Sequence, residues 1–330
     1  MTRTDRNDIW FAVVNVYAAS SKAADQWAKA EELLKQKGVV FHGTRTGSAG
    51  NATELTFDAC MAGYRKFIAV GGDGTVHDVL NGLASFVEWK TASGAEVSFS
   101  DFTMGVIPSG SGNDWIKTLG IPADPAAAVR IISEGKTGRQ DVVKVSMLNP
   151  DPGKEDQAIA VSYMANVGGI GIDARICERV NAMKREGKRG KILYVTSLIH
   201  AIRNRKPSRT KVVCDGETVY EGTYLSIAFG VGKYSGGGMR QTPAAVLDDG
   251  LLDMTLIPDL PLLRIAREAP RLFTDTFLKV PELVATKGKV YEIIPESASY
   301  AEPVEVDGEV VGKAPARMEV METGINIVIP

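Results

Sequence analysis

Val70-Gly-Gly-Asp-Gly-Thr75 is the stretch that decides the fold, and it has a counterpart in Pro108-Ser-Gly-Ser-Gly-Asn-Asp114. Each follows a short apolar run, at residues 66–70 and 102–107, that predicts a buried strand, and each leads into a helical pattern. Glycines between a strand and a helix let backbone N–H groups approach a phosphate, and the positive N-terminal end of the helix attracts it. Two such turns in successive strand–helix units, each with an aspartate, predict a nucleotide phosphate site.

Strand and helix patterns alternate around these turns. Strand patterns lie at residues 9–15 and 39–44, and helical patterns at residues 20–37, 51–63, 76–83 and from 124 onward. This alternation favours right-handed βαβ crossovers and a mostly parallel sheet. Ligands of such sheets bind beyond the carboxyl ends of the strands, where both glycine turns lie. We therefore predict a Rossmann-like, mostly parallel α/β nucleotide-binding domain over residues 1–139.

The pattern changes after residue 139. Strand patterns follow at residues 141–148, 158–167, 211–213, 218–229, 251–257, 290–294 and 318–329. Asp215-Gly216 and Asp307-Gly308 lie between alternating runs, which is typical of β-hairpin turns. Helical patterns at residues 173–205 and 261–278 interrupt the strands. We predict that residues 140–330 form an antiparallel, β-sandwich-like domain with helical insertions, whose final residues are free to pack back on the first domain.

Composition narrows the class of protein. The chain has 330 residues, 44% of them hydrophobic and 24% charged, as expected of a soluble globular protein of one large or two ordinary domains. A net charge of −2 argues against non-specific binding of nucleic acid. Three widely spaced cysteines, a polar N-terminal stretch and the lack of a long apolar run favour a cytoplasmic protein whose membrane contact, if it has one, is peripheral.

Two motifs resemble nucleotide signatures but lack their context. Gly135-Lys-Thr137 imitates the end of a P-loop, yet Arg130 stands where the first glycine is required. Gly169-Ile-Gly-Ile-Asp-Ala174 matches the loose dinucleotide fingerprint, but the preceding chain is hairpin-like, so we expect a structural tight turn there.

Several polar residues are candidates for chemistry. Thr46, Thr75 and Ser111 offer hydroxyl donors to a phosphate. Asp73 would act through Mg²⁺ or water, or would brace its own turn, and the sequence favours neither role. Asn113 and Asp114 are placed to cap the helix that follows them.

Two acidic turns further along the chain have an ordinary and a functional interpretation. Asp248, Asp249 and Asp253 flank Gly250 in an oxygen-rich stretch suited to Mg²⁺, but the spacing alone favours a plain Asp-Gly turn. Asp307-Gly-Glu309 alone is likewise a hairpin turn, and a role for Glu309 in catalysis requires it to reach a substrate hydroxyl.

Gly71-Gly-Asp-Gly-Thr75 and Gly105-Val-Ile-Pro-Ser-Gly-Ser-Gly-Asn-Asp114 resemble the catalytic domain of the diacylglycerol and sphingosine kinase family. The resemblance continues in the family's order along nearly the whole chain, through Asn166-Val-Gly-Gly-Ile-Gly-Ile-Asp173, Gly236-Gly-Gly-Met-Arg240 with Pro243, Asp248-Asp-Gly-Leu-Leu-Asp253 and Val306-Asp-Gly-Glu309. The chain is most similar to the compact bacterial lipid kinases of that family, because no regulatory domain flanks the catalytic unit.

The resemblance implies an ATP- and Mg²⁺-dependent kinase that phosphorylates a lipid hydroxyl, with the nucleotide in the cleft between two domains. It implies that the nucleotide is bound by residues 15–19 and by Thr46, Gly71, Gly72, Asp73, Gly74, Thr75, His77, Asp78, Gly110, Ser111, Asn113 and Asp114. Asp249 would hold Mg²⁺ through its carboxylate, and Val246 and Leu251 through backbone oxygens. Glu309 would accept the proton, with Asp307 beside it in the catalytic turn.

The chain departs from the family's pattern at two positions. Family members usually carry Asn-Pro-x-Ser-Gly after the first strand, whereas Asn15-Val-Tyr-Ala-Ala19 keeps the asparagine alone. The loop therefore lacks the rigidity of the proline, the conformational freedom of the glycine and the hydroxyl of the serine. Ser111 replaces the more common threonine, which is a milder change because the hydroxyl remains.

Two other functions stay open on the sequence alone. An NAD kinase-like protein shares the Gly-Gly-Asp-Gly-Thr turn, and the altered loop at residues 15–19 leaves room for a silent nucleotide- or lipid-binding protein. Residues 260–278 and the basic cluster at residues 184–191 are candidates for lipid entry or membrane contact, although helices packed on a sheet explain the first equally well. The residues do not decide which lipid is the acceptor, and they are compatible with a homodimer.

Overall fold

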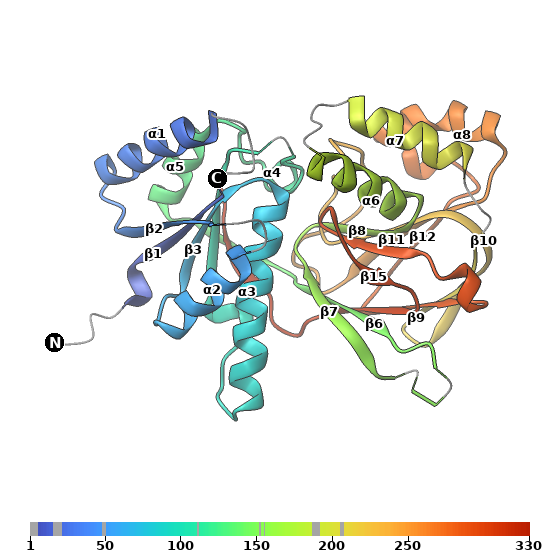
Figure 1. Ribbon diagram of the computed structural model, residues 1–330, viewed down its shortest axis with the longest axis horizontal. Helices are drawn as coiled ribbons and strands as arrows, with labels where there is room; N and C mark the ends of the chain where they lie inside the picture. Colours follow the sequence, from blue (N-terminus) through green and yellow to red (C-terminus); the bar gives the residue numbers. More distant parts are fainter. Residues whose placement is uncertain are drawn as a thin grey trace. The chain divides into compact units, whose positions relative to one another are not determined.

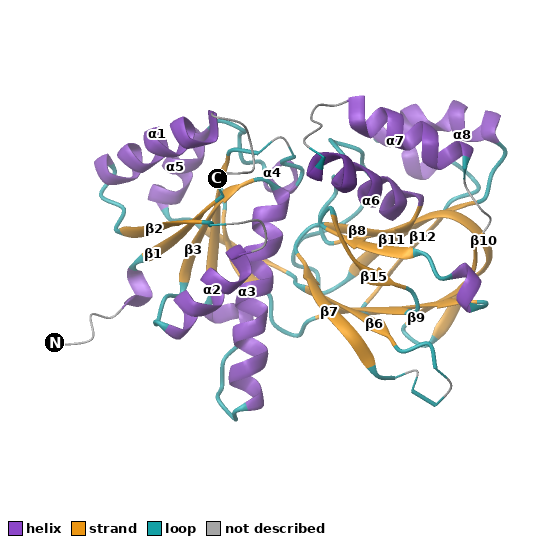
Figure 2. Ribbon diagram, in the orientation of Figure 1, coloured by secondary structure: helices purple, strands orange, loops and turns teal. Residues whose placement is uncertain are grey.

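The computed structural model describes residues 6–15, 22–47, 51–110, 112–151, 153–154, 156–186, 192–204 and 208–330 (Figures 1 and 2). The chain folds into two compact units. The first contains Met1–Val142 together with Glu322–Pro330, and the second contains Val143–Met321.

The first unit is built on a six-stranded sheet with the order β2-β1-β3-β4-β17-β5. Its strands are β1 (Trp10–Val14), β2 (Phe41–Arg45), β3 (Lys66–Gly71), β4 (Thr103–Pro108), β5 (Thr137–Gln140) and β17 (Ile325–Val328). The pairs from β2 to β17 are parallel, and β5 is antiparallel to β17. The sheet is therefore mostly parallel, as the alternating sequence pattern predicted.

Helices cover both faces of this sheet. They are α1 (Lys22–Gln36), α2 (Asn51–Met61), α3 (Asp73–Ala92), α4 (Trp115–Leu119) and α5 (Pro125–Glu134), with short 3-10 turns η1 (Arg6–Asp8) and η2 (Phe99–Asp101). α1 packs with α5 on one face and α2 with α3 on the other (Figure 1). The apolar face of α3 buries Val79, Leu80 and Leu83 completely, as its spacing of three and four residues predicts.

The strand order places a topological switch point between β1 and β3. The chain leaves β1 toward β2 on one side and then crosses back to β3 on the other. Right-handed crossovers put the two connecting helices on opposite faces, which opens a crevice at the carboxyl ends of β1 and β3. Asn15 follows β1 and Gly72 follows β3, so both lie at this crevice.

The last predicted strand, at residues 318–329, is wrong as a single element. It divides into β16 (Ala316–Val320) in the second unit and β17 in the first. β17 lies between β4 and β5, and the Asn326 side chain donates to the backbone oxygens of Ser100 and Phe102. The uninterrupted apolar pattern hid the bend between the two strands.

The second unit is built on an eleven-stranded sheet whose strand pairs are all antiparallel. Its main path is β15-β14-β8-β10-β9-β13-β16-β6-β7, and β11 and β12 extend it from β10. The strands are β6 (Val143–Leu148), β7 (Ala158–Met164), β8 (Val167–Gly171), β9 (Ser208–Cys214), β10 (Glu217–Gly230), β11 (Leu252–Pro258), β12 (Val284–Gly288), β13 (Val290–Pro295), β14 (Pro303–Val306) and β15 (Glu309–Lys313), besides β16. The end strands β15 and β7 contact each other, so the sheet nearly closes around its core.

Helices lie on the outer face of this second sheet (Figure 2). They are α6 (Ile172–Arg185), α7 (Ile192–Arg203) and α8 (Leu262–Glu268), with 3-10 turns η3 (Ala269–Phe273), η4 (Phe277–Lys279) and η5 (Ala298–Tyr300). The predicted helix at residues 261–278 is shorter than expected, because Pro270 cannot continue an α-helix and the chain passes into η3. The predicted fold class, a parallel α/β domain followed by an antiparallel β-sandwich-like domain with helical insertions, is confirmed.

Candidate functional site

The polar residues predicted to meet a nucleotide phosphate gather at one edge of the first sheet. Thr46 follows β2, Asn15 follows β1, the Gly71-Gly72 turn ends β3, and the Ser109-Gly110 turn follows β4. Because these four strands are parallel neighbours, their carboxyl ends bring the residues side by side. Asn15 donates from Nδ2 to Oγ1 of Thr75 at 3.1 Å, which ties the end of β1 to the first turn of α3.

The two glycine turns interlock through their backbones. The Asp73 N–H donates to the Gly112 oxygen at 3.1 Å, and the Ser109 N–H donates to the Gly71 oxygen at 3.0 Å. A Cβ on Gly72 would lie 2.5 Å from the Gly112 oxygen, and one on Gly110 would lie 2.7 Å from the Gly72 Cα. Glycine is therefore required at Gly72 and Gly110 for one turn to lie against the other.

Asp73 braces the second turn with its carboxylate. Oδ2 accepts from the Asp114 N–H at 2.9 Å and Oδ1 from the Trp115 N–H at 3.1 Å. Asp73 thus satisfies the first amides of α4, which Asp114 was predicted to cap. Asp114 makes no side-chain cap and pairs instead with Lys117, Oδ1 to Nζ, at 2.6 Å. Asn113 also stabilises the loop, donating from Nδ2 to the Gly110 oxygen at 2.8 Å.

Thr46 carries a buried hydroxyl that lacks a hydrogen-bond partner among the described residues. Its side chain is 4% exposed, and its backbone N–H donates to the Val14 oxygen. An unpaired buried polar group costs stability, so an ordered water or a ligand oxygen that accepts from this hydroxyl would stabilise it. His77 is buried in the first turns of α3, and the Asp78 backbone oxygen accepts from the Thr53 hydroxyl. Ser111 and residues 16–19 lie outside the described residues.

The proposed catalytic turn of the second unit joins β14 to β15. Asp307 and Gly308 both have positive φ, 52° and 90°, as a two-residue hairpin turn requires. The buried Asp307 carboxylate accepts from the backbone N–H groups of Ala165 and Asn166, each at 2.9 Å. These bonds fix the bend between β7 and β8, which interrupts the single strand predicted at residues 158–167.

Glu309 is exposed at the start of β15. Its Oε2 accepts from Asn181 Nδ2 at 3.3 Å, and the same nitrogen donates to the Gly308 oxygen at 3.1 Å. Cys177 also donates to the Gly308 oxygen. Two side chains of α6 therefore hold the turn from one side, and Glu309 remains exposed to solvent.

Glu305 and Asp173 form a buried acidic pair that the sequence reasoning missed. Burial raises the pKa of Glu305 well above its usual range, and the carboxylates of Asp173, Asp307 and Glu309 raise it further. Its Oε2 accepts from the Gly308 N–H at 2.9 Å. Burial also raises the pKa of Asp173, although a hydrogen bond from Ser226 opposes the shift.

The signal for this pair lies in the glycines opposite it. The motif at residues 169–174 is not the predicted tight turn, because Gly169 and Gly171 belong to the buried strand β8 that runs into α6. A Cβ on Gly169 would lie 3.2 Å from Glu305 Oε1 and 3.3 Å from the Asp173 Cβ. The glycine therefore makes room for two carboxyl groups.

The predicted metal loop lies just before β11. Asp249 Oδ1 accepts from the Leu251 N–H at 3.1 Å, and the Lys287 ammonium lies 3.2 Å from Asp249 Oδ2 and 3.1 Å from Asp253 Oδ2. Lys287 also donates to the Ala244 oxygen at 3.1 Å. The donor set is all oxygen, which fits Mg²⁺ chemically. Within the described residues, no three acidic, histidine or cysteine side chains lie close enough to hold a metal on their own.

Fold and turns together define a two-unit protein in which a mostly parallel α/β unit with two glycine turns is joined to an antiparallel β unit. The model of the diacylglycerol kinase catalytic domain matches residues 10–145, and that of the YegS C-terminal NAD kinase beta sandwich-like domain matches residues 166–329. The chain belongs to the diacylglycerol kinase catalytic-domain family, with a C-terminal domain of the YegS type.

Individual proteins that resemble this chain have names consistent with this family. A diacylglycerol kinase of Mycobacterium tuberculosis (strain ATCC 25618 / H37Rv) is 25% identical over 299 residues, which cover 90% of this chain and 87% of the relative. A probable lipid kinase YegS-like protein of Enterobacter sp. (strain 638) is 27% identical over 303 residues, covering 90% and 89%. A crystal structure described as a diacylglycerol kinase from Bacillus anthracis strain Sterne has the same fold, with a TM-score of 0.69 at 22% identity, and covers 99% of this chain and 98% of its own.

Proposed function

We propose that this protein is an ATP-dependent lipid kinase that transfers the γ-phosphoryl group to a lipid hydroxyl. The observation that carries the proposal is the pair of interlocked glycine turns at the switch point of the parallel sheet, together with the family. Phosphoryl transfer needs positioning of the phosphates, charge neutralisation and a proton acceptor, with little covalent chemistry from the protein. Each requirement has a candidate group in the chain.

In this proposal the first unit binds ATP. The N–H groups at the start of α3 and the hydroxyls of Thr46 and Thr75 donate to phosphate oxygens, with Gly74, Gly110, Ser111 and Asn113 in the loops around them. Asp73 contributes through the loop that it braces, because its two oxygens already accept from Asp114 and Trp115.

The second unit supplies the proton acceptor. Glu309 takes the proton of the lipid hydroxyl, and Asp307 and Glu305 hold the backbone of its turn. Asp249 and the backbone oxygens of Val246 and Leu251 are proposed to hold Mg²⁺, with Lys287 moving aside from Asp249. Mg²⁺ bound there would supply positive charge and order the loop before β11.

The protein is proposed to work in the cytoplasm and to reach its lipid from the membrane surface. No helix among the described residues is long and apolar enough to cross a membrane. Diacylglycerol, monoacylglycerol, sphingoid bases and phosphatidylglycerol all offer a suitable hydroxyl, so the acceptor is a question for the assay.

Transfer of labelled phosphate from ATP to a panel of these lipids, with NAD as a soluble acceptor, tests the proposal. We expect a labelled lipid product that depends on Mg²⁺. Glu309→Gln should fold and bind ATP normally yet lose most turnover, because an amide cannot accept the proton. Labelling of NAD alone would favour the NAD kinase-like alternative, and ATP binding without any product would favour a silent binding protein. Near-normal activity of Glu309→Gln would remove Glu309 from the base role.

A further inference from the structure

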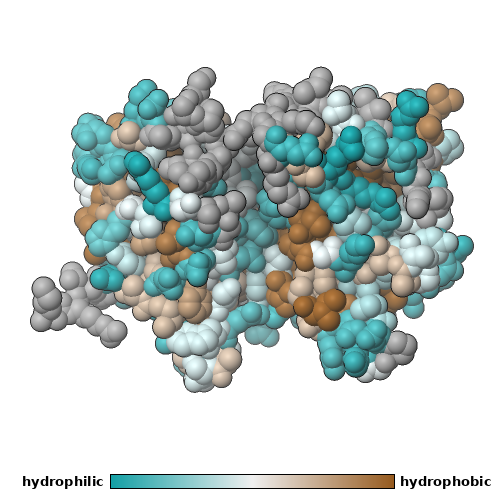
Figure 3. All heavy atoms as spheres, in the orientation of Figure 1, coloured by the Kyte–Doolittle hydropathy of each residue, from teal (hydrophilic) through white to brown (hydrophobic). Residues whose placement is uncertain are grey.

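The segment from α8 through η3 exposes large apolar side chains to solvent. Leu263 is 88% exposed, Phe273 59% and Leu262 49%. Figure 3 shows apolar atoms on the surface at the end of the second unit where Figure 1 places α8. Several large apolar side chains exposed together mark a surface that a partner can cover, because covering them removes apolar area from water.

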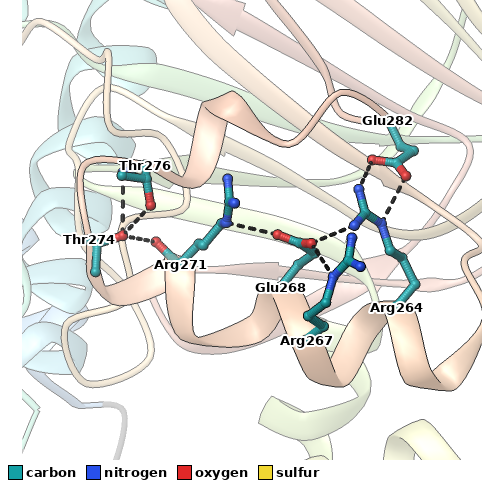
Figure 4. Close-up of polar contacts among 7 residues, drawn as sticks. All are labelled: Arg264, Arg267, Glu268, Arg271, Thr274, Thr276 and Glu282. Atoms are coloured by element: carbon teal, nitrogen blue, oxygen red, sulfur yellow. Dashed lines mark hydrogen bonds and ion pairs between the residues drawn. The ribbon is translucent and has the colours of Figure 1, made fainter.

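A buried glutamate gathers three arginines beside these apolar side chains (Figure 4). The Glu268 side chain is 11% exposed, and its carboxylate contacts Arg264 Nη1 at 2.6 Å, Arg267 Nε at 2.9 Å and Arg271 Nε at 2.8 Å. Arg264 is also bound by Glu282 through two parallel bonds of 2.9 and 2.8 Å. The cluster therefore contains three guanidinium groups and two carboxylates, and it keeps one excess positive charge.

Glu268 contacts Arg267 and Arg271 through their Nε atoms alone, so their terminal nitrogens stay available to another partner. Each offers its Nε to the carboxylate, and Figure 4 shows the terminal nitrogens of both pointing away from Glu268. No acceptor in the described part of the chain contacts those terminal nitrogens. The Arg267 side chain is 70% exposed and that of Arg271 41%. A guanidinium held at Nε presents its two terminal N–H edges in a fixed direction, which suits a phosphate.

An apolar and a basic side chain share one face of α8. Leu263 and Arg267 are four residues apart on α8, so their side chains are neighbours on the helix surface. Arg271 follows four residues later in η3. The nearby Asp275 is paired with Arg240 and so does not oppose an anionic partner. We call Leu262, Leu263, Arg267, Arg271 and Phe273 the α8 surface.

We propose that the α8 surface docks on a bilayer of anionic phospholipid. Leu262, Leu263 and Phe273 enter the boundary between headgroups and acyl chains, while Arg267 and Arg271 bind lipid phosphates. The excess positive charge of the cluster complements an anionic surface, although the chain as a whole carries a net charge of −2. The apolar side chains decide against a nucleic acid as the anionic partner. Docking does not require catalysis, so it stands apart from the proposed kinase activity.

Co-sedimentation with vesicles tests the proposal, using phosphatidylcholine alone and phosphatidylcholine mixed with phosphatidylglycerol. The wild-type protein should bind the mixed vesicles and bind phosphatidylcholine weakly. Leu263→Asp and the double variant Arg267→Gln/Arg271→Gln should each lower the partition coefficient at least fivefold. Added salt should weaken wild-type binding.

Matched controls lie on the same unit. Ile159→Asp places the same charge at another apolar side chain, 63% exposed on β7, and Arg209→Gln removes another exposed arginine, on β9. Both should bind mixed vesicles as the wild type does, and thermal unfolding checks that every variant is folded. The proposal is overturned if wild type ignores mixed vesicles or if the controls lose binding as much as the α8 variants. A homodimer that Leu263→Asp dissociates, without vesicle binding, also overturns it and assigns the surface to a second copy.

Discussion

At the residue scale, three Asp-Gly pairs make the same kind of contact. Asp73 accepts from the N–H groups of Asp114 and Trp115, Asp215 from those of Lys289 and Val290, and Asp307 from those of Ala165 and Asn166. In each case one carboxylate binds two consecutive amides of a segment far away in the sequence. Asp215-Gly216 and Asp307-Gly308 were predictable as turns from their residue types. Their partners were not, because the amides that they bind are at least 74 positions away.

The Thr46 hydroxyl gives a test of the nucleotide site that does not depend on turnover. Thr46→Val keeps the shape of the side chain and removes the buried hydroxyl that has no partner among the described residues. We expect the free protein to be at least as stable as the wild type, because the cost of that unpaired group disappears. ATP should bind roughly tenfold more weakly, since a hydrogen bond to a phosphate is lost. Calorimetric titration with ATP and thermal unfolding measure the two effects. Unchanged ATP affinity would place Thr46 outside the site.

Glu305 predicts a pH dependence of stability. Its folded-state pKa is raised, mainly by burial, so the folded protein keeps a proton that the unfolded chain releases near pH 4.5. The stability linked to this proton is fully present below the unfolded-state pKa and is lost as pH rises toward the folded-state pKa. The loss is at most about 1.4 kcal/mol per pH unit for one group.

Glu305→Gln removes the titrating group and keeps an acceptor oxygen for the Gly308 N–H. The free energy of unfolding of the variant, relative to the wild type, should therefore increase between pH 5 and pH 8. Urea unfolding at several pH values measures this difference. A difference that stays constant over that range would mean that Glu305 is ionised in the folded protein.

At the scale of elements, the two glycine turns form one structural unit, because backbone hydrogen bonds join them. Gly72→Ala would place a Cβ 2.5 Å from the Gly112 backbone oxygen, and the second turn would have to move. We expect a loss of stability of about 1–3 kcal/mol and loss of ATP binding. Gly47→Ala is the matched control, because no atom of the described residues lies within 4 Å of its added Cβ. If Gly72→Ala binds ATP as well as Gly47→Ala does, the interlocking of the turns is not needed for the site.

Elements were predictable wherever a local signal was strong. The run before Gly71 gave β3, and Asp124-Pro125 gave the start of α5, where the Asp124 carboxylate accepts from the Ala127 N–H. The failures have tertiary causes. The bend at Ala165 and Asn166 is held by the carboxylate of Asp307. Gly169 lies in a buried strand directly against the carboxyl group of Glu305, where a Cβ would be crowded. A single sequence carries the residues of such contacts but not their pairing.

At the scale of the whole molecule, the first unit is not one continuous segment of the chain. β17 pairs with β4 on one side and with β5 on the other, so the sheet is incomplete without residues 322–330. We expect a chain that ends at residue 321 to lose cooperative unfolding of the first unit and to lose ATP binding. A synthetic peptide of residues 322–330 should restore part of the binding by adding the missing strand. ATP binding by the truncated chain at wild-type affinity would contradict this prediction.

The position of β17 near the C-terminus also affects the order in which the two units complete folding during translation. Domains generally fold as they leave the ribosome, the N-terminal one first. Here the edge of β4 that pairs with β17 stays unpaired until residues 143–321 and then β17 itself have been translated. An open edge of this kind can pair with the edge of another chain. The nascent protein is therefore most prone to aggregate, and most in need of a chaperone, late in translation, when its second unit is nearly made and its first still lacks one strand.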